Sequence, residues 1–296
     1  MDIYQLRSFL VLAEHLHFGR AAQALHISQP ALTKQIRRVE EEIGAALFER
    51  SPTRTRLSAI GARWLPEVQA SVARIDALAR SVQLSVRGET GRLRVGFGFH
   101  TLEIVPALVA KLRTSSPDVS VTLRDMSTAE QAAALAADEL DIGFMRMPIA
   151  DSEEYSVVPV IEDRLALVLP QSGQRRRGVK LADLREEAFI SISRVRSPGF
   201  CNHVLAVCAA HGFHPRVVQE VYEFTTAIAL VRAGMGATFI PRSLWSGPMP
   251  GVELHELDDR RARWKVAAVW RRRDSNPVLK NFVRLLGRAA QSAAVE

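Results

Sequence analysis

The chain has 296 residues, which suggests about two domains on a prior of roughly 150 residues each. Its formal net charge is +7, with an isoelectric point near 10.0, so an acidic partner such as nucleic acid is plausible. No apolar run reaches the roughly 20 residues of a membrane span and the first residues do not form a signal peptide, so we expect a cytoplasmic protein.

Two helices are predicted before residue 28. Leu6, Phe9 and Leu10 mark the first helix, which is interrupted near His17. Phe18 to Leu25 forms a shorter second helix, in which small alanines permit a close helix crossing. A tight connection then leads into the most informative stretch of the chain.

That stretch is a third helix from Ser28 to Glu42. Its apolar face carries Leu32, Ile36, Val39 and Ile43 at helical spacing. The opposite face presents amide, hydroxyl and guanidinium groups, from Gln29, Thr33 and Arg37. These are the groups that hydrogen-bond base edges in a major groove. Ser28 can cap the helix, and Pro30 in its first turn costs little.

A short helix, a brief turn and a helix with a polar leading face have helix-turn-helix geometry. All charged residues from Arg20 up to Val39 are positive. The candidate DNA-binding residues of this part are Arg20, Ser28, Gln29, Pro30, Thr33, Lys34 and Arg37. An ordinary amphipathic surface helix is the alternative interpretation of the same pattern.

A small hairpin is expected between Leu47 and Leu57. Its tip contains Arg54 and Arg56, which could reach phosphate or a minor groove, so both are candidate DNA-binding residues. A solvated basic loop is the alternative.

Residues 59–87 are expected to form one long helix. Apolar residues recur three and four apart at Leu65, Val68, Val72, Ile75, Ala79, Val82 and Val86. That spacing is typical of a coiled-coil seam and predicts a dimer that holds two DNA-reading heads at a fixed separation. Pro66 is awkward inside such a helix, and a helix packed on its own domain is the alternative. Residues 88–91 are interpreted as a hinge.

From residue 92 onward the pattern changes to alternating strands and helices. Strands are expected at 92–99, 119–126, 141–146, 165–169, 217–221 and 265–271, and helices at 101–113, 127–138, 201–211, 225–233 and 277–288. This alternation predicts a parallel sheet with right-handed crossovers. We expect two α/β lobes, with lobe I at about 92–161 and 267–296 and lobe II at about 162–266.

Ligands bind such sheets at the carboxyl ends of the strands, where helix N-termini converge. Hydroxyl groups stand at these ends, and together with a helix start they favour a carboxylate or another small anion. Arg146, and Arg194 or Arg196, could supply a balancing cation, and Phe200 an apolar wall. The candidate effector-binding residues are His100, Thr101, Ser127, Thr128, Arg146, Phe200 and Thr225. For Ser127 a helix cap alone is the alternative, and for the arginines a solvated surface.

The N-terminal motif Phe18-x-x-Ala21-Ala22-x-x-Leu25-x-x-Ser28-Gln29-Pro30-Ala31-Leu32-Thr33, followed by Gly44-x-x-Leu47-Phe48-x-Arg50, resembles the head of LysR-type transcriptional regulators. The resemblance implies an α/β chain overall, with a winged helix-turn-helix at 1–58, a linker and dimerisation helix at 59–87, a hinge at 88–91 and an effector-binding domain at 92–296. That domain is similar to type 2 periplasmic binding proteins.

Within the family, the chain looks most like regulators of aromatic-acid and catechol breakdown, notably in Asp125-Met126-Ser127-Thr128-x-x-Gln131. The resemblance implies that the effector is a muconate-like or aromatic acid. It also implies that the binding site is lined by Thr101, Ser127, Thr128 and Phe200. It also implies a homotetramer that contacts RNA polymerase.

The resulting hypothesis is a ligand-responsive transcriptional regulator, taken as an activator, with no enzymatic activity, no cofactor and no metal. The residues leave activation and repression open. One alternative is a small-molecule-binding protein or enzyme of the two-lobed α/β class. A second is a thiol-based redox regulator that uses Cys201 and Cys208, although a spacing of seven residues on one helix separates them by about 10 Å.

Overall fold

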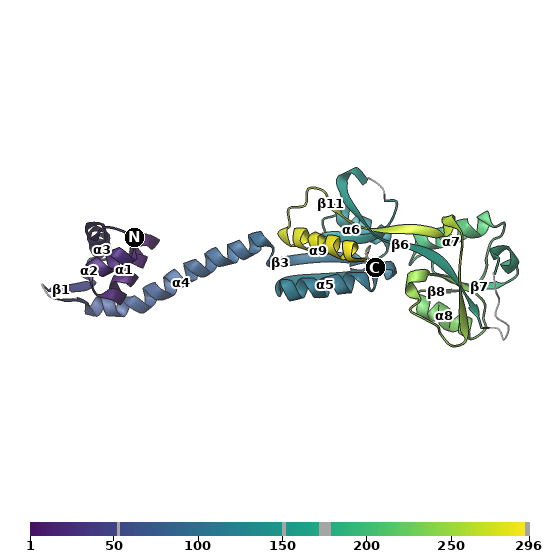
Figure 1. The fold of residues 1–296 in the computed structure, drawn as a ribbon, viewed down its shortest axis with the longest axis horizontal. Helices are drawn as coiled ribbons and strands as arrows, with labels where there is room; N and C mark the ends of the chain where they lie inside the picture. The colour runs from purple at the N-terminus through teal and green to yellow at the C-terminus, as the bar shows by residue number, and fades with distance from the viewer. Residues whose placement is uncertain (52–53, 150–151, 172–178, 294–296) are drawn as a thin grey trace. The chain divides into compact units, whose positions relative to one another are not determined.

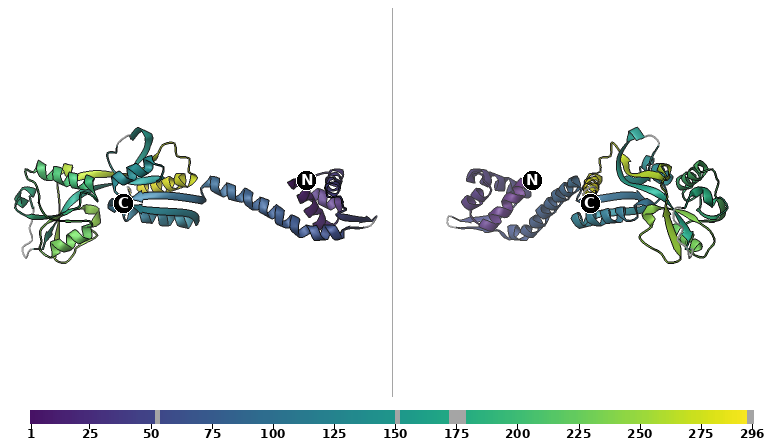
Figure 2. Two further views of the ribbon diagram at one scale, coloured as in Figure 1. Left: turned by 180° about the vertical axis from the view of Figure 1, so that it is seen from behind. Right: turned by 45° about the vertical axis from the view of Figure 1, so that its right-hand side comes forward.

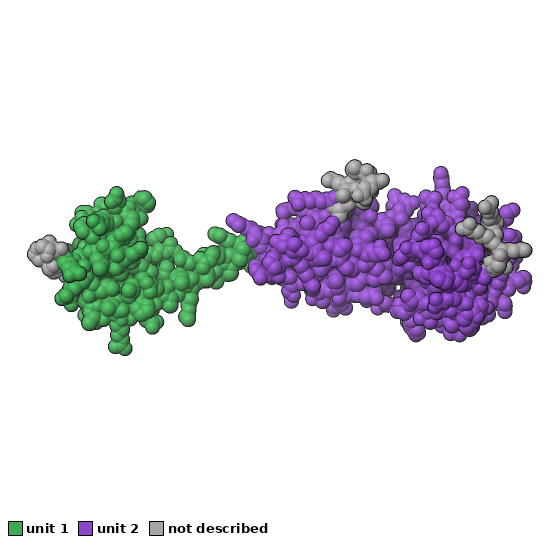
Figure 3. All heavy atoms as spheres, turned by 60° about the horizontal axis from the view of Figure 1, so that its bottom comes forward, with its two compact units in different colours: residues 1–86 green, residues 87–296 purple. Residues whose placement is uncertain are grey.

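The computed structural model describes residues 1–51, 54–149, 152–171 and 179–293. The chain divides into two compact units, residues 1–86 and residues 87–296 (Figure 3). Each unit has its own buried hydrophobic clusters. Among the described residues, no helix is long and apolar enough to cross a membrane.

The first unit begins with a compact head (Figure 1). Its elements are α1 (Ile3–His15), α2 (Phe18–Ala24), α3 (Gln29–Ile43), β1 (Phe48–Ser51) and β2 (Arg54–Leu57), the last two paired as an antiparallel hairpin. Phe9 is fully buried and its ring lies 5.5 Å from that of Phe48 and 4.9 Å from that of Trp64. The apolar face of α3 is buried against this cluster, which leaves its polar face outward.

Local capping sets the limits of α3. The Ser28 hydroxyl accepts a hydrogen bond from the Ala31 amide at 3.4 Å, and Gly44 ends the helix in the left-handed region at φ 75°. The carboxylate of Glu40 then accepts from the amides of Leu47 at 2.9 Å and Phe48 at 3.2 Å. Glu40 therefore attaches the start of the hairpin to α3.

The helix α4 (Ala59–Arg87) continues the first unit, and Pro66 lies inside it. Val68 and Val72 pack into the core of the head. Beyond them the apolar side chains are exposed, by 44% at Ile75, 65% at Leu78, 55% at Val82 and 70% at Val86. The second half of α4 thus carries an apolar stripe that no other described residue covers.

The second unit starts where α4 ends. Gly88 has a φ of +68°, and a Cβ added there would lie 2.6 Å from the carbonyl oxygen of Pro277. The Asn281 amide donates to the carbonyls of Arg87 at 2.7 Å and Gly88 at 3.2 Å. Backbone conformation and space both require glycine at this connection.

The remaining elements form two lobes. The strands are β3 (Thr90–Phe97), β4 (Asp118–Asp125), β5 (Ile142–Arg146), β6 (Tyr155–Pro170), β7 (Ala188–Ile192), β8 (Arg216–Val221), β9 (Thr238–Pro241), β10 (Val252–Glu256) and β11 (Arg263–Arg271). The helices are α5 (Ile104–Ser115), α6 (Thr128–Ala136), α7 (Pro198–Ala210), α8 (Phe224–Arg232) and α9 (Pro277–Ala293). Short 3-10 helices are η1 (Phe99–Thr101), η2 (Ser152–Glu154), η3 (Leu181–Leu184), η4 (Arg242–Leu244) and η5 (Arg260–Ala262).

The main sheet is mixed, which corrects the prediction of a parallel sheet. Its strand order is β10-β6-β11-β5-β3-β4, with β9 also paired to β6. Only part of the prediction is right, because β3 runs parallel to β4 and β5, and β7 parallel to β8, whereas β11 runs antiparallel to both β5 and β6. The reason is that the long strands β6 and β11 carry the chain out of one lobe and back again, in opposite directions.

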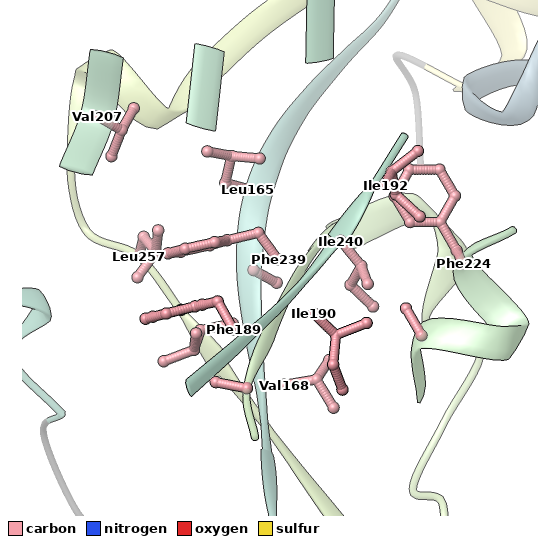
Figure 4. Packing of buried hydrophobic residues seen from close by; sticks show 14 of the residues in the cluster. Leu165, Val168, Phe189, Ile190, Ile192, Val207, Phe224, Phe239, Ile240 and Leu257 are labelled. Carbon is pink, nitrogen blue, oxygen red and sulfur yellow. The ribbon is translucent and has the colours of Figure 1, made fainter. Parts of the chain in front are cut away.

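These two strands join separate hydrophobic cores (Figures 1 and 2). In lobe I, α5 and α9 cover one face of the sheet and α6 the other. In lobe II the rings of Phe189 and Phe239 stack at 5.5 Å (Figure 4). The core of lobe II includes Val266 and those of lobe I include Ala267 and Ala268, and the register between β6 and β11 shifts at that point.

Candidate functional site

The polar face of α3 is accessible along the first turns of the helix. Ser28, Gln29, Pro30, Lys34 and Arg37 are exposed. Thr33 is half-buried, and its hydroxyl donates to the carbonyl of Gln29 at 3.0 Å. A shallow surface groove along α3 is lined by Gln29, Pro30, Thr33, Lys34, Arg37, Arg38 and Glu41. Most of the predicted α3 residues thus lie on one continuous face.

The charges on this face are largely uncompensated. Within the described part of the chain, Arg20, Lys34 and Arg37 form no salt bridge, whereas Arg38 pairs with Glu42 at 3.6 Å. Arg20 lies on α2 and is exposed. Three cations are therefore available to a polyanion without first breaking an ion pair.

The two arginines predicted at the tip of the hairpin lie in its second strand, β2. Arg54 is the first residue of β2 and Arg56 lies two residues further along the same strand, whereas residues 52–53, which connect the strands, lie outside the described residues. Arg56 is paired with Glu49 at 2.7 Å. Arg56 is thus partly neutralised, because the strand register sets Glu49 directly opposite it.

A cleft of about 880 Å³ lies between the two lobes of the second unit. Lobe I contributes His100 from η1, Ser127 and Thr128 from the start of α6, and Arg146 from the end of β5. Lobe II and the returning strand contribute polar side chains, including Arg196 and Asn202, and a set of aromatic and imidazole groups. These are Phe200 and His203 from α7, Phe224 from α8 and Trp264 from β11. Both sides of the cleft therefore mix polar and apolar side chains, since lobe I also contributes Met126, Phe144 and Met147.

Three arginines line the cleft, and Arg146 differs from Arg196 and Arg263 in that it forms no ion pair with a described residue. Its guanidinium lies 4.5 Å from the centre of the Trp264 ring, and Nη1 donates to the carbonyl of Gly199 at 3.2 Å. Nη2 contacts Nδ1 of His203. No Asp or Glu of the described chain lies within ion-pair distance of Arg146. Burial lowers the pKa of the arginine to about 10, although the charge of Asp163 acts in the opposite direction, so Arg146 stays charged at neutral pH.

His203 is neutral beside this arginine. Burial, and then the positive charge of Arg146, lower the pKa of His203 to about 4. A neutral imidazole accepts the hydrogen bond from Arg146 but cannot offset its charge. An arginine that is partly desolvated and has no carboxylate partner favours an anionic ligand.

The two hydroxyl groups at the start of α6, those of Ser127 and Thr128, form different hydrogen bonds. Ser127 forms a capping box with Glu130, in which its hydroxyl accepts from the Glu130 amide at 3.3 Å and its own amide donates to the carboxylate at 2.7 Å. The Thr128 hydroxyl accepts from the Arg146 amide at 3.2 Å. The O–H of Thr128 therefore still has its hydrogen to donate, next to the backbone of Arg146.

The structure leaves two predicted effector residues out of the cleft lining. Thr101 is fully buried, and its hydroxyl donates to the Gly98 carbonyl at 3.2 Å, because the turn of η1 directs it into the protein. Thr225 is exposed on α8, and Phe224 is the residue that faces the cleft there. Neither threonine belongs to the group formed by His100, Ser127, Thr128, Arg146 and Phe200.

Comparison with known proteins decides the family. A model described as "Bacterial regulatory helix-turn-helix protein, lysR family" matches residues 3–62, and one described as "LysR substrate binding domain" matches residues 87–291. The chain belongs to the LysR family of transcriptional regulators. This LysR regulator binds DNA and responds to a ligand.

Its relatives match it over nearly the whole length. The HTH-type transcriptional regulator ClcR of Pseudomonas putida is 35% identical over 294 residues, which cover 97% of this chain and 98% of ClcR. CatR of Pseudomonas putida is 33% identical over 293 residues, covering 98% of this chain and 100% of CatR. The structure of full-length CbnR complexed with its target DNA has a TM-score of 0.79 and 28% identity, covering 98% of this chain and 100% of that one.

Several cleft residues of this LysR regulator were missing from the prediction. His203 and Trp264 hold Arg146, and neither was among the predicted residues. Arg196, which was predicted as a possible balancing cation, pairs with Asp125 of lobe I at 2.8 Å. Phe200 and His203 are three residues apart, so a helix starting at Pro198 already implied a shared face. Nothing in the local pattern indicated Trp264, because its role depends on where β11 passes between the lobes.

The two cysteines do not have the environment of reactive thiols. Both lie on α7 and are buried, and the Cys201 thiol donates to the Ile192 carbonyl at 3.1 Å. Burial raises the pKa of Cys208 to about 12, and that of Cys201 is also raised. These thiols are protonated at neutral pH, which disfavours the redox alternative. In the described ranges, no group of three or more His, Cys, Asp or Glu could hold a metal ion.

Proposed function

We propose that this LysR regulator reads promoter DNA with the polar face of α3 and senses a small organic acid in the cleft between its two lobes. The observation that carries the ligand proposal is Arg146, a half-buried cation with no carboxylate partner among the described residues. An acid would supply that partner. The Thr128 hydroxyl can donate to the same carboxylate.

For DNA, α3 enters the major groove. Arg37 suits guanine and Gln29 suits adenine, with Thr33 between them on the same face. Arg20, Lys34 and the amides near Ser28 contact phosphate. Pro30 packs beside the backbone, and the hairpin arginines Arg54 and Arg56 assist from β2.

For assembly, the exposed stripe on α4 pairs with a second copy of the chain. Two heads then bind two half-sites, and their binding free energies add. A tetramer of two such dimers follows from the family. The regulator works in the cytoplasm and activates transcription by altering the contact between bound DNA and RNA polymerase. The boundaries proposed for its parts are 1–58, 59–87, 88–91 and 92–296.

The ligand is a muconate-like or aromatic acid. Its carboxylate lies at Arg146, Ser127 and Thr128, with its apolar part against Phe200. The ring of Phe200 lies 5.1 Å from that of Phe224 and 5.9 Å from that of Phe99, so this wall is a continuous aromatic cluster. Apolar walls with few polar groups are typical of small-molecule sites.

Isothermal titration calorimetry on the full-length protein tests the proposal, with benzoate, hydroxybenzoates and cis,cis-muconate as ligands. We expect at least one acid to bind, and Thr128→Ala to weaken it by about 1–3 kcal/mol, the cost of leaving a buried polar group unpaired. Thr225→Ala is the matched control, because Thr225 is exposed outside the cleft. Binding of no acid, or equal losses in both variants, would contradict the proposed site.

A further inference from the structure

His100 is an unusual residue for its place in the cleft. It lies in η1, with its side chain only 10% exposed, and its ring packs 3.9 Å from that of Phe99 and 5.1 Å from that of Trp264. It is among the residues that line the cleft. An imidazole held between two aromatic rings has little freedom to turn, so its two nitrogens have fixed directions.

A buried carboxylate determines which nitrogen carries the proton. Asp163 on β6 accepts hydrogen bonds from the Arg164 amide at 2.8 Å, the Ser243 amide at 3.2 Å and the Ser243 hydroxyl at 2.7 Å. Although burial alone would raise it, the hydrogen bonds from His100 and Ser243 hold the pKa of Asp163 below its ordinary value. An ionised carboxylate can only accept.

The contact between His100 and Asp163 therefore assigns the tautomer. Nδ1 of His100 lies 3.3 Å from Oδ2 of Asp163, so Nδ1 must carry the hydrogen. Burial, with the charge of Arg146 adding to it, lowers the pKa of His100 despite the nearby carboxylate, which keeps the ring neutral. Nε2 is then a lone-pair acceptor.

This acceptor has no partner within the described chain. No hydrogen bond to Nε2 of His100 is formed there. Since Nε2 is not among the fully buried polar atoms that lack a partner, it is not fully buried. It is the only ring nitrogen of His100 left for a ligand. The cleft thus contains a cation that can bind a carboxylate, Arg146, and a hydrogen-bond acceptor without a donor, Nε2 of His100.

We infer that the ligand is a carboxylic acid that also carries a hydroxyl group, with the carboxylate bound at Arg146 and the hydroxyl donating to Nε2 of His100. This inference rests on the proposed function and narrows its ligand class. A dicarboxylate without a hydroxyl would place an acceptor against an acceptor at His100. An acid that lacks the donor leaves Nε2 unpaired, and sites built to bind a hydroxyl discriminate strongly against such analogues.

The test is calorimetry on the full-length protein with matched ligands. The panel consists of benzoate, the three hydroxybenzoate isomers, the corresponding methoxybenzoates, which accept but cannot donate, and cis,cis-muconate. We expect at least one hydroxybenzoate to bind about tenfold or more tightly than benzoate, while its methoxy counterpart does not, as one added hydrogen bond predicts.

Variants then locate the preference. His100→Phe should bring the affinity ratio of hydroxybenzoate to benzoate to about one, whereas His100→Gln, which retains an acceptor, should keep part of it. Asp163→Asn should also reduce the ratio, because an amide can donate to Nδ1 and favour the other tautomer. His214→Phe, at an exposed histidine, should leave the ratio as in the wild type.

The results distinguish a failure of this inference from a failure of the proposed function. If benzoate or muconate binds as tightly as every hydroxybenzoate, or if the preference survives His100→Phe, this inference is wrong and the proposed acid sensor stands. If no acid binds, the proposed function fails, and this inference with it. Should His100→Phe not fold by thermal melting, the hydroxy and methoxy pair on the wild-type protein still decides.

Discussion

Arg146 shows at the scale of one residue how a binding group can oppose folding. Burial lowers its pKa in the folded protein to about 10, well below the ordinary value of an arginine. The folded state therefore binds this proton less tightly than the unfolded chain does. The charge opposes folding at every pH below about 10, and this opposition is relieved only as the pH rises above about 10.

Replacing Arg146 by methionine should therefore separate binding from stability. We expect the affinity for the acid to fall about 10–100-fold, the loss of a charge-assisted hydrogen bond. The melting temperature should be unchanged or higher, because methionine can lie over Trp264 without a desolvated charge. Calorimetry and thermal denaturation measure the two effects. A destabilised protein that still binds acid at the original affinity would contradict this account.

His203 should make the second unit sensitive to acid. Its pKa is lowered to about 4, by burial first and then by Arg146, whereas the unfolded chain has the ordinary value of 6.5. Between those values the unfolded state binds more protons, so stability falls as the pH falls from about 6.5 to about 4. Above about 6.5 the residue is neutral in both states and adds no pH dependence.

His203→Gln removes this titration but keeps an acceptor for Arg146. We expect the variant to lose about 1 kcal/mol less stability than the wild type between pH 7 and pH 4.5, after allowance for solvent screening of a partly exposed group. Urea denaturation followed by tryptophan fluorescence measures the difference. His214→Gln, at an exposed histidine, is the control and should follow the wild-type curve. Parallel curves for His203→Gln and the wild type would show that His203 does not titrate in this window.

At the scale of the element, the exposed groove along α3 contains both an arginine without an ion pair, Arg37, and an ion-paired arginine, Arg38. Arg37→Ala and Gln29→Ala should each weaken binding to a duplex selected from a random pool by about 1–3 kcal/mol, the value of one good base contact. Arg38→Ala is the matched control, since Arg38 lies on the same helix but pairs with Glu42. It should weaken selected and random duplexes alike. Gel shifts with both duplexes give the ratio, and an unchanged ratio for Arg37→Ala would contradict the proposed face.

The exposed stripe on α4 gives a prediction about assembly. Ile75→Glu places a carboxylate in the apolar seam and should convert the dimer to a monomer at micromolar concentration, because desolvating an unpaired charge is costly. Ala77→Glu adds the same group to an exposed position off the seam and should leave the dimer intact. Light scattering after size-exclusion chromatography reports the mass. Equal masses for both variants would show that α4 is not the dimer contact.

The same scale shows which elements local pattern can predict. The helices of the head and the strands β3, β4 and β5 have clear apolar periodicity. In β6 Glu162 and Asp163 interrupt the apolar run, and the side-chain partners of Asp163, His100 and Ser243, are distant in sequence. The strands β7, β9 and β10 are four or five residues long, and their pairing with distant segments is not visible locally.

The cleft residues, like the elements, were predictable only where the local sequence indicates their position. Ser127, Thr128 and Phe200 follow from helix starts, and Arg146 from the end of a strand, so their neighbours in sequence indicate where they lie. Thr101 and Thr225 satisfy the same rule but point elsewhere, because side-chain direction changes with every residue of a turn. Trp264 and Asp163 lie opposite each other on β11 and β6, a pairing that depends on the whole fold.

At the scale of the second unit as a whole, ligand binding and lobe arrangement share residues. The ion pair of Arg196 with Asp125 and the hydrogen bond from Arg146 to Gly199 both join lobe I to lobe II. His100, Asp163 and Ser243 join both lobes to a connecting strand. An acid bound at Arg146, as proposed, would change the contacts available across the cleft. It would then have different affinities for different lobe arrangements, which is the requirement for any ligand-driven change.

That coupling has a quantitative consequence for the full-length protein. If the acid changes the affinity for a selected DNA duplex by some factor, the duplex must change the affinity for the acid by the same factor. We expect a factor of about 5–150, typical of allosteric coupling. Calorimetry of the acid with and without duplex, and gel shifts with and without acid, give the two values independently. In Arg146→Met the acid should leave the gel shift unchanged at concentrations that saturate the wild type. A wild-type factor of one in both measurements would mean that acid binding and DNA binding are independent, because a ligand with equal affinity for two arrangements shifts neither.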